Sequence, residues 1–127
     1  MPGWSEDQLR RIDGAEEVQI APVGRDGKVG AGQTIWVVRV GEGLYVRSAR
    51  VPSSDWHRRA RATGRARLTV GGTAAFVAVQ DADGAALDAV DAAYDEKYGR
   101  RYASIVEGIS DEAHRVTTLR LIPRDEA

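Results

Sequence analysis

Hydrophobic and polar residues alternate along this chain with two different periods, which predict short strands separated by helices. Near the start, Ser5 and Gln8 have the spacing of a helix capping box, and apolar residues at helical steps follow them. We therefore predict a short helix over residues 5–13. Residues 16–23 then alternate between apolar and polar side chains, which predicts a first strand.

The next segment combines a glycine-rich stretch with a hairpin pattern. Residues 24–32 read GRDGKVGAG, which is too rich in glycine for regular structure and predicts a loop that carries Arg25 and Lys28. Residues 34–40 and 44–49 are rich in β-branched and aromatic side chains and are separated by Gly-Glu-Gly. This pattern predicts two strands joined as a hairpin.

A helix is expected after that hairpin. Ser53 or Ser54 is the residue type that caps a helix N-terminus, and Gly64 supplies a stop at the other end. Residues 65–70 then alternate cleanly, and a Gly-Gly pair turns the chain into a partner strand over residues 73–80.

The last third predicts helices and a closing strand. Apolar residues recur at three- and four-residue steps from Leu87 to Tyr98, and Gly99 marks the expected end of that helix. Residues 101–109 predict another short helix and residues 115–122 a final strand. The six strands and three or four helices are connected by hairpins, so we predict an α+β fold built on an antiparallel barrel or curved sheet.

The composition limits the size of the molecule and its chemistry. With 127 residues, 43% of them hydrophobic, the chain fits a single domain over residues 1–127. It has no cysteine, which excludes disulfides and thiolate chemistry. No apolar segment approaches the ~20 residues that a membrane helix needs, and the first residues lack a leader pattern. We expect a cytoplasmic protein without a membrane partner.

Charge is placed unevenly in this chain, whose formal net charge is only −1. Residues 47–67 hold seven arginines and one acid, whereas residues 81–97 hold six acids and one base. Sixteen arginines against two lysines also fit the coding bias of a GC-rich genome. The two segments either pair with each other, within the fold or between subunits, or present surfaces of opposite sign.

The strongest candidate site lies where the predicted hairpin ends and the next helix begins. A strand-end arginine that faces a helix N-terminus favours a phosphate or carboxylate, because free backbone N–H groups and the helix dipole both attract an anion. The alternative is that the arginines are exposed surface side chains and the serines an ordinary cap. The residues that form this constellation are Arg47, Ser48, Arg50, Ser53 and Ser54.

Other chemistry finds little support in the sequence. His57 and His114 stand alone without ligand spacing, so no metal is expected. There is no nucleophile elbow or phosphate-binding glycine motif, and catalytic residues cannot be assigned. Nucleic acid is an unlikely partner because the chain is near neutral, with a pI of about 6.1. Trp56 has the spacing of a core residue, whereas Trp36 either lines a barrel interior or packs a planar ring.

Several motifs together resemble a known superfamily. The chain is similar to the split β-barrel flavin-binding proteins, and within them to the deazaflavin-dependent nitroreductase-like group and an uncharacterised family of unknown function related to it. The motifs that carry this resemblance are GRDGK at residues 24–28, TIWVV at 34–38, LYVRS at 44–48, the helix with Trp56, RLTVGG at 67–72 and, for the uncharacterised relatives, AYDEKYG at 93–99.

The resemblance implies a six-stranded, FMN-binding-like split β-barrel that is often a homodimer and holds FMN or a deazaflavin coenzyme. In such enzymes the cofactor supplies the redox chemistry, so a missing acid–base set does not argue against catalysis. The sequence departs from the group at Asp26, which would oppose an anionic cofactor if it faced inward, and by lacking a proline after Thr34. Residues that match cofactor-binding positions by this resemblance are Arg25, Lys28, Thr34, Arg47, Ser48 and Trp56.

The sequence therefore leads to one expected function and two alternatives. We expect a flavin- or deazaflavin-binding oxidoreductase that acts on a small organic molecule. The first alternative is a non-enzymatic split-barrel module that binds another anionic metabolite or a partner. A domain that binds nucleic acid or protein is the second.

Overall fold

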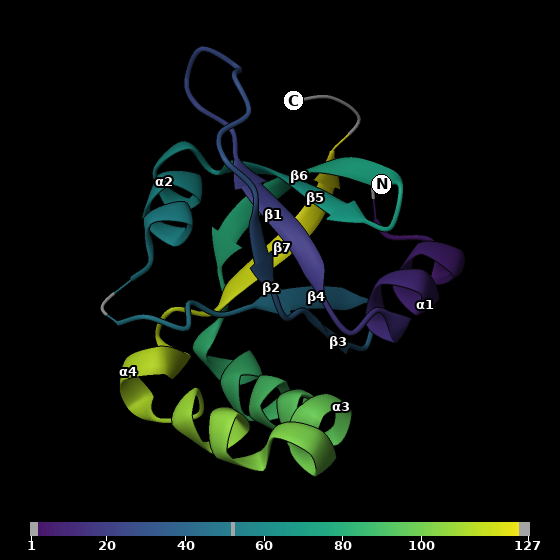
Figure 1. The fold of residues 1–127 in the computed structure, drawn as a ribbon, viewed down its shortest axis with the longest axis vertical. Coiled ribbons are helices and arrows are strands. Elements are labelled where there is room, and N and C mark those ends of the chain that lie inside the picture. Colours follow the sequence, from purple (N-terminus) through teal and green to yellow (C-terminus); the bar gives the residue numbers. More distant parts are fainter. Residues whose placement is uncertain (1–2, 52, 125–127) are drawn as a thin grey trace.

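A single curled antiparallel sheet organises the molecule (Figure 1). The computed structural model describes residues 3–51 and 53–124. Within them the sheet order is β2-β1-β5-β6-β7-β4-β3, and every pairing is antiparallel. The expected α+β split-barrel class is confirmed. The seven strands of the described residues are β1 (Val18–Pro22), β2 (Gln33–Ile35), β3 (Val38–Val40), β4 (Gly43–Val46), β5 (Arg65–Val70), β6 (Thr73–Asp81) and β7 (Leu119–Arg124).

Two of the strand pairings in this sheet, β3–β4 and β5–β6, are tight hairpins. Gly41 and Gly71 occupy their turns with φ values of +60° and +59°, in the left-handed region that glycine adopts without steric cost. Both hairpins were predicted from the sequence. Gly-Glu-Gly at residues 41–43 indicated the first, and Gly-Gly at residues 71–72 indicated the second. The closing strand was predicted to begin too early, since β7 starts at Leu119 rather than at residue 115.

The two outer strands of the sheet, β2 and β3, are consecutive in the chain. Only Trp36 and Val37 separate them, so the two edges of the sheet are joined covalently at one end, and no other described strand pairs with their outer sides. The prediction of one strand over residues 34–40 was wrong in this respect. The chain crosses there from one edge of the sheet to the other, which turns the six predicted strands into seven.

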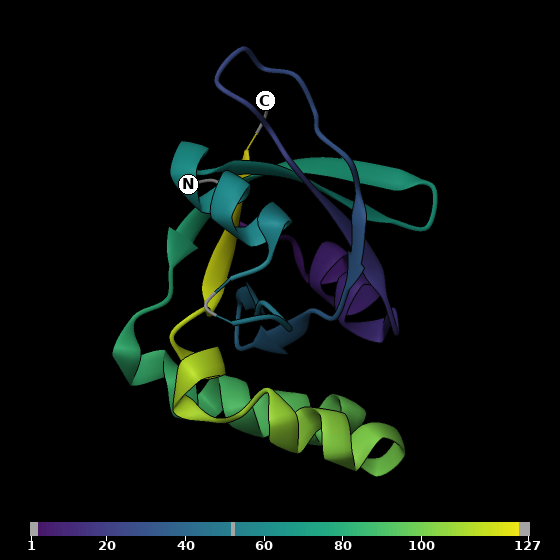
Figure 2. The same ribbon diagram turned by 60° about the vertical axis from the view of Figure 1, so that its left-hand side comes forward.

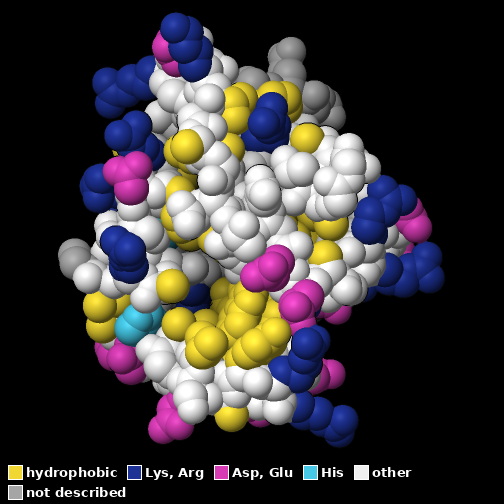
Figure 3. Space-filling model, viewed as in Figure 1, with side chains coloured by type: hydrophobic (Ala, Val, Ile, Leu, Met, Phe, Trp, Pro, Cys, Tyr) yellow, Lys and Arg dark blue, Asp and Glu magenta, His cyan; other side chains and the backbone are white. Residues whose placement is uncertain are grey.

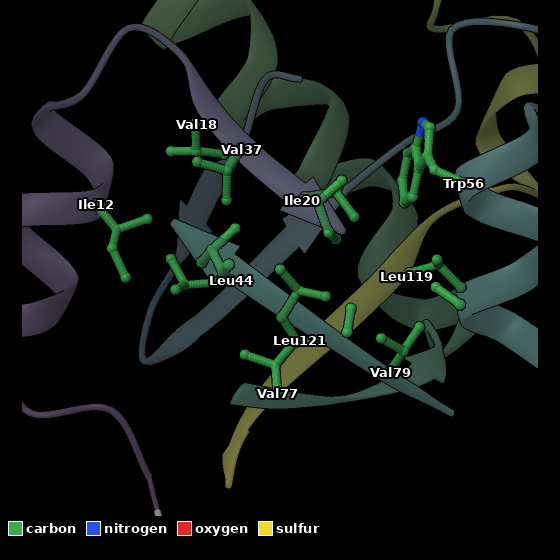
Figure 4. Packing of buried hydrophobic residues seen from close by; sticks show 14 of the residues in the cluster. Ile12, Val18, Ile20, Val37, Leu44, Trp56, Val77, Val79, Leu119 and Leu121 are labelled. Carbon is green, nitrogen blue, oxygen red and sulfur yellow. The ribbon is translucent and has the colours of Figure 1, made fainter. Parts of the chain in front are cut away.

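The concave face of the sheet holds the main core, with α1 (Glu6–Gly14) and α2 (Asp55–Thr63) packed against it (Figure 4). Both bonds of the predicted capping box between Ser5 and Gln8 are present at the start of α1. Gly64 ends α2 with a φ of +72°, as predicted. The core residues labelled in Figure 4 are Ile12, Val18, Ile20, Val37, Leu44, Trp56, Val77, Val79, Leu119 and Leu121.

A helical layer covers one end of the sheet (Figures 1 and 2). It consists of the 3-10 turn η1 (Gly84–Ala86), the long helix α3 (Leu87–Gly108) and the short helix α4 (Glu112–Arg115). The predicted helix end at Gly99 was wrong, because α3 continues through it and breaks at Tyr102, where φ is −135° and ψ is 42°. Among the described residues, no helix is long and apolar enough to cross a membrane.

Helix α3 is anchored at the junction between the two sheet edges. Trp36 stacks on Tyr98 with ring centroids 3.9 Å apart and planes 4° from parallel. The Tyr98 hydroxyl donates to the Glu16 carbonyl at 2.8 Å, and Lys97 Nζ donates to the Val37 carbonyl at 2.7 Å. Burying these polar groups is tolerated because each has a partner. The junction and α3 therefore form one packed unit.

Lys97 makes the stability of this unit depend on pH in a defined direction. Burial lowers the pKa of its ammonium group from 10.5 to about 8, and Asp13 opposes part of that shift. At a pH between these two pKa values, Lys97 is more often protonated in the unfolded chain than in the folded protein. The free energy of unfolding should therefore rise by about 1–2 kcal/mol as the pH increases from about 8 to about 10, which chemical denaturation at several pH values would measure.

The measurement has an upper limit and a control. Burial raises the pKa values of Tyr94 and Tyr98 above their ordinary 10.0, so above that pH the ionised tyrosines of the unfolded chain reverse the slope. Lys97→Met should abolish the rise below pH ~10. An equally large rise in that variant would show that another group causes it.

Candidate functional site

A cleft of about 800 Å³ lies beside the β2 edge of the sheet. Its three walls are the edge strand β2 with the loop before it, the segment from Arg47 to Arg59, and helix α3. Figure 3 shows apolar side chains gathered between the sheet and the α3 layer, in the lower half of the view. Of the nine residues that the sequence predicted for the site, those that line the cleft are Thr34, Arg47, Arg50, Ser54 and Trp56.

Aromatic rings form much of the cleft wall. Trp36 lies at the end of β2, and the Tyr102 ring leans on it with centroids 5.3 Å apart. Trp56, from the first turn of α2, is only 6% exposed. Figure 4 shows its indole nitrogen turned away from the labelled core residues, and no described residue accepts a hydrogen bond from it. The cleft therefore offers flat apolar surfaces, and the Trp56 indole N–H has no acceptor among the described residues.

Arg47 lies at the floor of the cleft with its side chain 1% exposed. Its Nε donates to Thr118 Oγ1 at 2.9 Å and its Nη1 to the Ile109 carbonyl at 3.0 Å. Nη2 lies 2.6 Å from Asp91 Oδ1, and the guanidinium carbon lies 5.2 Å from the centre of the Tyr94 ring. The donors of this arginine are thus directed into the fold, toward α3 and the segment before β7.

Ser48 and Ser54 organise the turn between β4 and α2. The Ser48 hydroxyl donates to the Arg50 carbonyl at 2.6 Å and accepts the Ser54 N–H at 2.8 Å. The Ser54 hydroxyl lies 2.6 Å from the Ser48 oxygen, to which it donates because the Ser48 proton is already used. Ser54 is the N-cap residue of α2, as predicted, yet its side chain does not cap the helix. The first N–H groups of α2 therefore lack a side-chain acceptor among the described residues.

Charges at the rim of the cleft are mostly paired. Asp55 Oδ1 lies 2.6 Å from Arg58 Nη2, and its Oδ2 lies 2.9 Å from Arg59 Nε. Arg50 is exposed and forms no ion pair with any described residue. Glu17 lies on the opposite rim. Arg50 is therefore the cation at the rim that remains available to a bound anion.

Four predicted site residues do not line the cleft: Arg25, Lys28, Ser48 and Ser53. The loop with Arg25 and Lys28 projects beyond the sheet (Figures 1 and 2), and only its later residues Gly30 and Ala31 line the cleft. Asp26 Oδ1 accepts the Lys28 N–H at 3.0 Å, so this carboxylate serves its own turn instead of facing a ligand. Ser53 lies in a separate hollow.

That second hollow, of about 840 Å³, lies beside α2 and is also lined by His57 and Arg61. His57 Nε2 lies 2.7 Å from the Thr117 carbonyl, and burial lowers the pKa of the imidazole. His114 Nδ1 lies 2.5 Å from Asp111 Oδ1. Neither histidine lines the first cleft, and the described residues contain no group of three side chains suited to hold a metal ion.

The sequence-based list missed several cleft residues. Gln33 and Tyr102 line the cleft but carried no motif, and Tyr94 was placed in the apolar stripe of its helix and in the AYDEKYG motif but not in the site. Trp36 had been interpreted as a residue of the barrel interior or of a ring-packing surface. The break in α3 at Tyr102 places that ring beside Trp36, and no local pattern indicates such a break.

The open curled sheet with a cleft at its split defines a split β-barrel. Solved structures share this fold at low sequence identity. A haem storage protein, HutZ from Vibrio cholerae, is 15% identical with a TM-score of 0.67, covering 94% of this chain and 90% of that one. An FAD- and haem-binding protein from Mycobacterium smegmatis is 19% identical with a TM-score of 0.61, covering 93% and 65%. An F420 reductase is 18% identical with a TM-score of 0.51, covering 100% and 97%.

Residues 8–121 match the family model described as "Uncharacterized protein conserved in bacteria (DUF2255)". The chain belongs to this family. No curated protein matches it.

Replacing Arg47 should destabilise the protein more than replacing an arginine at the rim. Arg47→Leu removes two buried hydrogen bonds and one of the two arginine partners of Asp91, so we expect a loss of about 3 kcal/mol in the free energy of unfolding. Arg59→Leu removes only an exposed ion pair and should cost less than about 1 kcal/mol. Urea unfolding of both variants measures the difference, and equal losses would contradict a structural role for Arg47.

Proposed function

We propose that the cleft binds a flavin or deazaflavin cofactor, and that the protein uses it as an oxidoreductase on a small organic molecule. The observation that carries this proposal is the aromatic cleft between β2, α2 and α3. Its volume of about 800 Å³ and its Trp36, Tyr102 and Trp56 side chains suit a flat ring system. The FAD- and haem-binding protein and the F420 reductase that share the fold support the same interpretation.

The residues around the cleft fit the two chemical parts of such a cofactor. The aromatic side chains provide contact for the ring, and the indole N–H of Trp56 is free to donate to a polar atom. The start of α2 has uncapped N–H groups, and Arg50 stands beside it without an ion-pair partner. We place the phosphate there, because helix N-termini and arginines both favour anions.

The protein's own contribution would be to bind, orient and shield. A flavin-type cofactor supplies hydride or electron transfer when bound. Arg47 acts in this proposal as a positioning residue, because its bonds to Thr118 and Ile109 hold two walls of the cleft together. Ile105 and Tyr102 limit the access of water from the α3 side.

A histidine-ligated haem fits these residues less well. HutZ stores haem and the M. smegmatis protein binds it, but both histidines of this chain lie outside the cleft lining. A non-redox anionic metabolite held by Arg50 and the start of α2 is the second candidate, and the uncapped helix start favours it. We also propose a homodimer in the cytoplasm, for which light scattering after size exclusion would test the oligomeric state.

Cofactor binding should quench the fluorescence of two particular tryptophans. The chain has three, and Trp4 donates its indole N–H to the Leu121 carbonyl and does not line the cleft, unlike Trp36 and Trp56. Titration with FMN, FAD and a deazaflavin at micromolar concentration should quench the wild type and the Trp4→Phe variant. The double variant with Trp36→Phe and Trp56→Phe should lose the response. If no cofactor alters fluorescence or absorbance, the redox proposal fails.

Arg50 should distinguish a phosphorylated flavin from its unphosphorylated form. Arg50→Ala should weaken FMN binding about 5–10-fold, the effect of losing one exposed charge-assisted hydrogen bond, and leave riboflavin binding unchanged. Arg25→Ala is the matched control, because Arg25 does not line the cleft. Equal weakening of FMN and riboflavin would remove Arg50 from the phosphate position.

A further inference from the structure

The outer edge of β2 is a sheet edge that lines the cleft. β2 is the terminal strand of the sheet and pairs only with β1 among the described residues. Its residues Gln33, Thr34 and Ile35 all line the cleft. An edge strand presents backbone N–H and C=O groups that no neighbouring strand uses. The pairing of β2 with β1 determines which residue of β2 presents these free backbone groups.

The hydrogen bond between Gly30 and Pro22 sets the orientation of β1. The Gly30 N–H donates to the Pro22 carbonyl at 2.7 Å, so this carbonyl points toward the β2 side. Carbonyls two residues apart in a strand point the same way, which directs those of Ile20 and Val18 to β2 as well. The backbone carbonyl of the intervening residue, Gln19, points instead toward β5, where Gln19 lies opposite Thr69.

The register then identifies the unpaired residue of β2. Ile20 lies opposite Gln33, Val18 opposite Ile35, and Gln19 opposite Thr34. In an antiparallel pair, residues opposite each other either exchange both hydrogen bonds or turn both groups away. Thr34 is of the second kind, so its backbone N–H and C=O point away from β1, along the edge that borders the cleft.

We infer that the backbone N–H and C=O of Thr34 recognise a flat heterocycle through an adjacent C=O and N–H on its ring, as in a lactam or cyclic imide. The two groups form a donor and an acceptor on one residue, and the ring would complete the pairing that a further strand would otherwise supply. Trp36, two residues on, provides an aromatic surface beside this pair. The edge thus selects for the hydrogen-bonding pattern of the ring rather than for its charge.

A small ring suits this edge better than an extended peptide. β2 has three residues and Thr34 alone turns both backbone groups outward, whereas strand addition needs several such residues in a row. The inference rests on the proposed function to the extent that flavins and deazaflavins carry an imide at one end of the ring. It adds which end of the ring faces β2 and which protein atoms bind it.

Two variants separate the backbone donor from the side chain. Thr34→Pro removes the N–H, and proline is tolerated at an edge position whose N–H takes no part in the ladder. Thr34→Ala keeps the backbone groups and is the matched control. We expect riboflavin to bind Thr34→Ala within about twofold of the wild type and Thr34→Pro at least about tenfold more weakly. Circular dichroism and thermal unfolding establish that both variants are folded.

A methylated ligand tests the other half of the pair. N3-methylriboflavin lacks the imide N–H, so it should bind the wild type about tenfold more weakly than riboflavin does. The inference is overturned if a folded Thr34→Pro variant binds riboflavin as tightly as Thr34→Ala, or if methylation has no effect. In either case flavin binding itself, and with it the proposed function, would still stand.

A simpler imide tests the edge without any flavin. Lumazine, a bicyclic imide, should shift the backbone amide resonance of Thr34 in a ¹⁵N-labelled wild-type protein, and 3-methyllumazine should shift it much less. This measurement also applies if Thr34→Pro fails to fold. A shift of the Thr34 amide without flavin binding would support the edge and overturn the proposed function, whereas no shift with either lumazine overturns the inference.

Discussion

The buried guanidinium of Arg47 is the interaction on which the arrangement of the cleft depends. It joins the end of β4 to the Ile109 carbonyl after α3, to Asp91 within α3 and to Thr118 just before β7. A buried cation is costly unless hydrogen bonds and a counter-charge compensate it. Because the three acceptors come from separate segments, the cation is satisfied only when the helical layer sits against the end of the sheet. The same contacts fix the distance between two walls of the cleft.

The third wall of the cleft is the edge strand β2, and its position follows from the way the sheet ends. β2 and β3 are joined through Trp36 and Val37, and the stacking of Trp36 on Tyr98 holds this junction against α3. The sheet is therefore closed by the chain and by packing at one end, while its β2 edge stays unpaired. A fully hydrogen-bonded barrel would have used up the edge of β2. The split leaves both the cleft and its backbone groups accessible.

Much of the fold could be predicted from local pattern, whereas the cleft could be predicted only in part. The capping box at Ser5, the turn glycines and the alternation over residues 65–70 each depend on neighbours in sequence, and these predictions were confirmed. The break at Tyr102 and the strand crossover after Ile35 depend on contacts between distant segments, which leave no local signal. The same holds for Arg47, whose partners Thr118, Ile109 and Asp91 all lie more than 40 positions away in sequence.

The contrast between the arginine-rich and acid-rich segments takes on a different meaning once these partners are known. Arg47 and Arg61 from the basic segment pair with Asp91 and Asp81 from the acidic one, so two ion pairs join the segments within the fold. Arg58 and Arg59 share Asp55. Four of the seven arginines of the basic segment are therefore ion-paired, whereas Arg50, Arg65 and Arg67 form no ion pair with a described residue. With Arg50 as a rim cation free of ion pairs among the described residues, the binding that we propose for the cleft would combine this charge with ring stacking and directed hydrogen bonds.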